Sequence, residues 1–102
     1  MELSAAEARA HALRNELLLK VQTAQQKLAR AIAAATRLRE DILPRAESVL
    51  QAAEARYRAG DTGFSELLPV RRDWTRVRLD YLETLHEVMQ AWAALSPYVW
   101  QE

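Results

Sequence analysis

The chain has no cysteine, and only two glycines and three prolines among its 102 residues. Without cysteine there is no disulfide framework, thiolate metal ligand or thiol nucleophile. No run of about 18 apolar residues could span a bilayer as a helix, and no signal peptide is expected at the N-terminus. Fourteen basic and fourteen acidic side chains cancel. We therefore expect neither nucleic acid nor direct membrane insertion for this chain.

The two glycines, Gly60 and Gly63, interrupt two long segments rich in Ala, Leu, Arg and Glu, which are strong helix formers. This pattern predicts an all-α fold, a long antiparallel helical hairpin of the coiled-coil type. Gly60 suits a helix C-cap, and Asp61 or Thr62 can cap the following helix, with Glu66 in its first turn. We expect one domain in four parts: a first arm over residues 3–59, a tip over 60–63, a second arm over 64–96 and a tail over 97–102.

Small and apolar residues recur along the first arm with a spacing of 3.5 residues, which is typical of coiled coils. They form two heptad columns, Leu17-Ala24-Ala31-Leu38 and Val21-Leu28-Ala35-Ile42-Val49. Because many of these positions are alanine, a neighbouring helix can approach closely.

Pro44 interrupts the first arm, because proline lacks an amide hydrogen and collides with the carbonyl group one turn back. We expect a kink or a short break near Leu43. The register is predicted to survive, because Ile42 and Val49 are one heptad apart. A separate short third helix over residues 45–59 is the alternative.

The second arm carries two apolar stripes. The first is expected to pack against the first arm and consists of Leu67, Trp74, Tyr81, Val88 and Leu95. The second stripe lies on another side of the helix and consists of Phe64, Leu68, Leu79, Leu82 and Met89. A lone hairpin covers only one stripe, so the second predicts self-association into a helical bundle or a larger assembly. Pro69 falls in or near the first turn, where proline is tolerated.

The two arms are unequal in length. Residues 64–96 can pair with roughly residues 27–59, so the first 26 residues would overhang by about 39 Å at 1.5 Å per residue. Leu13, Leu17 and Val21 stripe this overhang, which therefore needs a partner. At the other end, Ser96-Pro97 is predicted to terminate the second helix.

The residues usually found in catalytic and metal sites are sparse. His11 and His86 are the only histidines and lie far apart in any hairpin with its tip at Gly60, so we expect no metal site. No nucleophile elbow, phosphate loop or zinc spacing is present, and neither an enzyme nor a cofactor is expected.

The three tryptophans raise the question of a membrane-interface belt. Trp74 falls on the first stripe, the main one, and Trp92 on the column beside it that runs from Val70 and Val77 to Leu85 and Trp92, which favours core packing. Trp100, in the tail, leaves an interfacial role open.

Several short motifs surround the predicted tip in a fixed order. They are Ile42-Leu43-Pro44, Ala52-Ala53-Glu54, Tyr57-Arg58-Ala59-Gly60, Phe64-Ser65-Glu66-Leu67-Leu68 and Arg72, followed by Ala91-Trp92-Ala93-Ala94-Leu95. This order resembles the second half of TolC-like outer-membrane efflux factors, and within them the branch that works with heavy-metal exporters. The resemblance covers roughly residues 5–97.

The resemblance implies a periplasmic hairpin, one of several that pack side by side into the tunnel of a trimeric outer-membrane channel. Such channels export metal ions or small toxic compounds together with a periplasmic adaptor protein and an inner-membrane pump. It implies that the tip serves adaptor docking and gating through Tyr57, Arg58, Gly60, Asp61, Thr62, Gly63 and Glu66.

Two features depart from the family pattern. Pro69 stands where relatives often have Asp, and the chain lacks the strand-forming segments of the outer-membrane barrel. We therefore expect a hairpin portion rather than a complete channel. The alternative is a homo-oligomeric coiled-coil module for scaffolding, with no role in transport.

Overall fold

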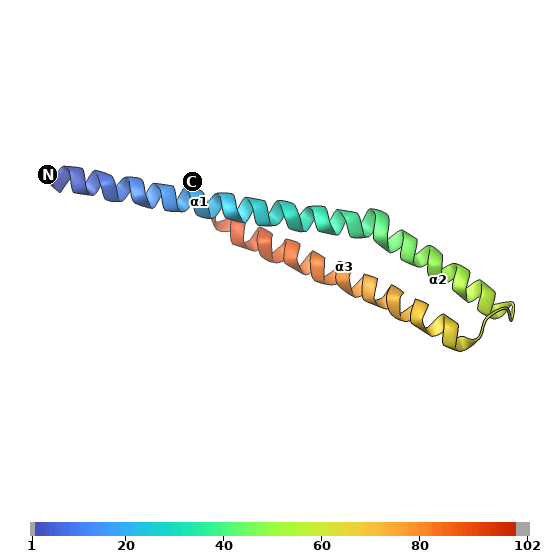
Figure 1. The fold of residues 1–102 in the computed structure, drawn as a ribbon. Coiled ribbons are helices and arrows are strands. Elements are labelled where there is room, and N and C mark those ends of the chain that lie inside the picture. Colours follow the sequence, from blue (N-terminus) through green and yellow to red (C-terminus); the bar gives the residue numbers. More distant parts are fainter. Residues whose placement is uncertain (1, 100–102) are drawn as a thin grey trace.

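The computed structural model describes residues 2–99, which form an extended helical hairpin measuring 86 × 23 × 15 Å (Figure 1). Its elements are α1 (Glu2–Arg37), a π-helical turn η1 (Leu38–Ile42), α2 (Leu43–Arg58) and α3 (Phe64–Val99). The first three run as one bent rod, and α3 returns antiparallel and contacts all of them. Residues 2–99 contain no strand, so the predicted all-α hairpin is confirmed.

The first arm bends at η1 without breaking (Figure 1). Pro44 has no amide hydrogen for the carbonyl group of Glu40, four residues earlier. The turn before it widens instead, because the amide of Leu43 donates to the carbonyl oxygen of Leu38, five residues back. The arm thereby remains one continuous helical rod, and the alternative of a separate third helix over residues 45–59 does not apply.

The π-helical turn shifts the heptad register of the first arm. After half-buried Leu28 and buried Ala35, the contact side continues at Leu43 and Leu50, because the widened turn adds one residue to a heptad. The predicted continuation through Ile42 and Val49 is wrong, since their side chains are 36% and 57% exposed. A proline that widens a turn therefore changes which residues face α3.

The core of the hairpin is a thin seam between the arms. Its most buried residues are Ala31, Ala35, Leu67, Ala91 and Leu95. Of the predicted main stripe, Leu67 and Leu95 are buried, and the three residues between them, Trp74, Tyr81 and Val88, are half-buried. Trp92 lies at the edge of the seam with 48% of its surface exposed, so the expectation that it packs in the core is wrong.

The second arm is longer than predicted, because α3 passes through Ser96 and Pro97 and ends at Val99. The fixed φ of proline is compatible with a helix, and Ala93 lies on the exposed side, where water can reach the carbonyl group that Pro97 leaves without a donor. The second arm begins at Phe64, as predicted, and Pro69 lies just beyond its first turn. Trp100 and the end of the predicted tail lie outside the described residues.

The overhang is correspondingly shorter than predicted. Val21 and Ala24 are the first half-buried residues of α1, and Tyr98 is the last half-buried residue of α3. Residues 2–20 are exposed throughout, and we call this segment the overhang. At 1.5 Å per residue it extends about 28 Å beyond the paired part. In Figure 1 the overhang is the blue end of α1.

Candidate functional site

The first arm ends in a compact turn built around Gly60. The amide of Gly60 donates to the carbonyl oxygen of Tyr57 at 3.1 Å, and the amide of Asp61 donates to that of Arg56 at 2.9 Å. This pair of bonds is a Schellman motif, which requires a left-handed residue at its centre. Gly60 supplies it with φ of 79°, so the predicted glycine cap is confirmed.

The second arm starts at Phe64, three residues after Asp61 closes the turn. Gly63 immediately precedes α3, and the amide of Glu66 donates to the Gly63 carbonyl oxygen at 3.1 Å. The N-cap position therefore belongs to Gly63, and the prediction of Asp61 or Thr62 as the cap is wrong. Glu66 lies in the first turn, as predicted, where its carboxylate meets the positive end of the helix dipole.

Two aromatic rings link the arms at the tip. The rings of Tyr57 and Phe64 lie edge to face, with centroids 6.0 Å apart and planes at 67°. Tyr57 is 41% exposed and Phe64 is 50% exposed. The pair therefore joins the arms and also offers aromatic surface to solvent.

An ionic cluster behind these rings connects the two arms. The Oε2 atom of Glu54 on α2 lies 3.2 Å from Nη2 of Arg58, and its Oε1 atom lies 3.6 Å from Nε of Arg71 on α3. The Glu54 side chain is 27% exposed, so water screens the cluster only in part. Sequence reasoning missed the Glu54–Arg71 pair. Laying the two arms antiparallel about the tip and matching opposite charges is the signal that could have found it.

The buried seam begins directly below the tip. Leu67 is 1% exposed and is the most buried side chain of the seam. One heptad further, the guanidinium carbon of Arg78 lies 4.6 Å from the ring centroid of Trp74, within cation–π range. Within residues 2–99 the buried Nε1 of Trp74 has no hydrogen-bond partner. Aliphatic and aromatic packing therefore dominates this part of the hairpin.

The residues that the sequence predicts for docking gather at one end of the rod. Thr62 is half-buried, and the others are exposed: Tyr57, Arg58, Gly60, Asp61, Gly63 and Glu66. They combine an aromatic ring and opposite charges on a projecting surface. Such a surface suits contact with another protein.

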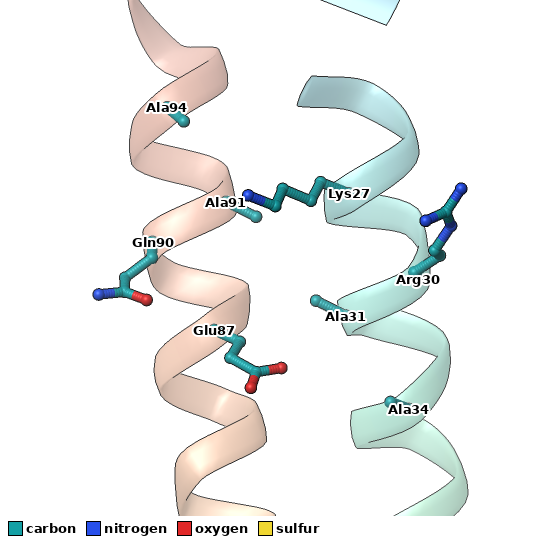
Figure 2. A pocket seen from close by; sticks show the side chains of 8 residues that line it. All are labelled: Lys27, Arg30, Ala31, Ala34, Glu87, Gln90, Ala91 and Ala94. Carbon is teal, nitrogen blue, oxygen red and sulfur yellow. The ribbon is translucent and has the colours of Figure 1, made fainter. Parts of the chain in front are cut away.

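The hairpin also carries a shallow groove of about 560 Å³ between α1 and α3, far from the tip (Figure 2). Its lining residues are Lys27, Arg30, Ala31, Ala34, Glu87, Gln90, Ala91 and Ala94. Figure 2 shows Lys27 reaching toward α3, Glu87 pointing toward the first arm, and Arg30 directed away from α3. The groove therefore has an alanine floor between the helices and a charged rim.

Other candidate sites receive little support from the geometry. His11 lies on the overhang and His86 on α3, and residues 2–99 hold no group of three or more potential metal ligands. Across the same residues, no helix combines the length and apolar character that a membrane span needs. The tip remains the strongest candidate site.

Comparisons of the chain with family models, with curated proteins and with solved structures found no match. The motifs around the tip are therefore the only basis for the resemblance described above.

Proposed function

We propose that the chain is a helical-hairpin portion of a TolC-like efflux channel, with a tip that docks onto a periplasmic adaptor protein and contributes to gating. One observation carries this proposal. The residues that match the family's tip motifs surround a Schellman turn at the exposed end of an 86 Å rod. A rod with its recognition residues at one end suits end-on contact between two elongated proteins.

The outer side of α3 supports the side-by-side packing that a tunnel wall requires. Four residues of its second stripe stay exposed beyond the seam: Phe64 at 50%, Leu79 at 53%, Leu82 at 58% and Met89 at 68%. Leu68 of the same stripe is half-buried. Large apolar side chains at this spacing offer a helix-packing face to a neighbour.

In this proposal the chain works at the outer membrane and in the periplasm, together with an adaptor and an inner-membrane pump. The exported compounds are metal ions or small toxic molecules. The hairpin itself contributes packing surface and a docking tip, without a cofactor.

The proposal is tested by titrating the α-hairpin of an adaptor from the same organism against the purified chain, with affinity measured by calorimetry. Glu66→Lys reverses an exposed charge at the tip, and Glu83→Lys makes the same change at an exposed site midway along α3. We expect Glu66→Lys to weaken binding about tenfold or more, the scale of a lost charged contact at an interface. Glu83→Lys should leave it unchanged. Equal affinities for the two variants would remove the tip from the docking role.

The second candidate function is a homo-oligomeric coiled-coil module for scaffolding. The overhang favours it, because Leu3, Leu13 and Leu17 are 73%, 60% and 50% exposed outside the hairpin. This function requires self-association but no affinity for an adaptor. The same titration therefore separates the two candidates.

A further inference from the structure

The overhang presents an apolar stripe that shares one heptad column with the interface between α1 and α3. Leu3, Ala10 and Leu17 follow one another at heptad spacing on α1, and the same column continues with Ala24 and Ala31, which pack toward α3. The column therefore keeps its apolar character beyond the point where α3 ends. The second column of the seam, Val21-Leu28-Ala35, leads back to Arg14 and Glu7, so on the overhang the apolar stripe is completed by Ala6 and Leu13 on the other side of the Leu3 column.

We propose that a second copy of the chain covers this stripe, with its own overhang running antiparallel. A two-fold axis then passes between residues 11 and 12, so that each copy contributes the same surface. This pairing does not depend on the function of the tip, and it uses neither the tip nor the second stripe of α3.

Side-chain sizes along the stripe fit this antiparallel register. Ala10 faces the partner's Leu13, and Ala6 faces the partner's Leu17. Because of the two-fold symmetry, each of these pairs occurs twice along the interface. Each small residue thus meets a large one, which fills the space between two closely spaced helices. In the outermost layers Leu3 faces the partner's Lys20, whose aliphatic stem can cover it while the ammonium group reaches water.

Charges on both flanks of the stripe also match. On one flank Glu7 faces the partner's Arg14, and on the other Arg9 faces the partner's Glu16, each twice by symmetry. All four contacts join opposite charges. Within one copy, Nζ of Lys20 lies 3.5 Å from Oε1 of Glu16, and the second carboxylate oxygen remains available to the partner's arginine.

A parallel pair of overhangs would meet like charges instead. In a parallel coiled coil, a residue on one flank faces the partner residue five positions later. Glu2 would then face the partner's Glu7, and Arg9 would face the partner's Arg14. The charge pattern therefore disfavours the parallel pair and selects the antiparallel one.

The length of the gap fits a second overhang. Val21 is the first half-buried residue of α1, so α3 stops covering α1 near that level. In the proposed register the partner's Glu2 lies level with Val21. The described part of the partner's overhang therefore reaches the level at which α3 stops covering α1, and the two hairpins join into one rod of about 140 Å with a tip at each end.

A matched pair of substitutions tests the surface by sedimentation velocity over a concentration series. Leu13 on the stripe is 60% exposed, and Leu19 on the opposite face is 64% exposed. Both lie outside the seam with α3, so Leu13→Glu and Leu19→Glu should retain the helical content that circular dichroism reports. We expect an elongated dimer for the unaltered chain and for Leu19→Glu. Leu13→Glu should raise the dimer Kd about tenfold or more, since it places two carboxylates in the stripe.

The orientation is tested with a spin label, because the chain has no cysteine and Ser4→Cys provides a unique attachment site. In the antiparallel dimer the two labels lie about 22 Å apart along the helix axis, at 1.5 Å per residue. In a parallel dimer they lie at the same level. Any one of three results would overturn the proposal. The chain could stay monomeric up to millimolar concentration, the two leucine substitutions could have equal effects on the dimer Kd, or the two labels could lie at the same level along the helix axis.

Discussion

The two ends of the paired region hold the arms together by different means. Near the tip, the arms are joined by the turn at Gly60, the edge-to-face rings and the almost fully buried Leu67. At the open end, three of the four buried positions, Ala31, Ala35 and Ala91, are small, and the fourth is Leu95. The tip end therefore depends on one large side chain and on local contacts, and the open end depends on close approach of two helices.

This difference predicts that the tip end is destabilised mainly by loss of side-chain volume and the open end mainly by added volume. Removing volume near the tip leaves a cavity that the surrounding side chains cannot refill, because Leu67 is enclosed on all sides. Adding volume at the open end forces the helices apart, because alanines set their separation. The following substitutions test this comparison, starting with the largest expected effect.

The substitution Leu67→Ala is expected to destabilise the hairpin most. Truncating a buried leucine to alanine costs about 3 kcal/mol, a large part of the stability of a small domain. Urea denaturation followed by circular dichroism measures the change. Leu79→Ala, at a position 53% exposed, serves as control and should cost less than about 1 kcal/mol at concentrations where the chain is monomeric. If the two variants lose similar stability, Leu67 does not anchor the tip end.

The sequence predicted the hairpin itself because its signals are local. Glycine is confined to two positions, and only a residue without Cβ adopts the φ of 79° found at Gly60 at low cost. Heptad spacing also indicated Leu67 and Leu95, which are buried in the structure. The turn and the main contact side could thus be derived from residue types and their periodicity.

The features that sequence reasoning missed depend on how the backbone responds to a perturbation. A proline in a helix predicts a lost hydrogen bond, but not that the preceding turn widens and shifts the register away from Ile42 and Val49. Pro97 was expected to end α3, yet one lost hydrogen bond near a solvated end does not stop the helix. The Glu54–Arg71 pair depends on the relative axial position of the arms, which heptad columns alone do not determine and which has to be set by counting residues from the tip.

The substitution Ala91→Leu tests the open end, with a smaller expected effect. A leucine at this position adds volume between α1 and α3 beside the groove that Ala91 lines, and we expect this overpacking to cost about 2 kcal/mol. Ala93→Leu makes the same change at an exposed site of α3 and should be nearly neutral. Both changes are measured by urea denaturation. A neutral Ala91→Leu would mean that the alanines do not set the helix separation and that the open end packs loosely.

The smallest effect is expected for Gly60→Ala, which isolates the contribution of the turn to the tip end. A Cβ at Gly60 would meet nothing within 4 Å, so the expected loss of about 1 kcal/mol comes from backbone conformation alone. Gly63→Ala is the control, because its φ is not left-handed and its Cβ would lie 3.9 Å from Oγ of Ser65, an ordinary contact.

Hydrogen exchange at the amide of Asp61, which closes the turn onto Arg56, separates a local effect from a global one. If Gly60→Ala speeds exchange there but leaves the midpoint of urea unfolding almost unchanged, the turn is a local device and Leu67 holds the tip end. If Gly60→Ala instead destabilises the hairpin as much as Leu67→Ala does, the turn and the buried leucine act as one cooperative unit. The contrast between the two ends would then lie between a cooperative tip and an open end whose buried positions are mostly alanine.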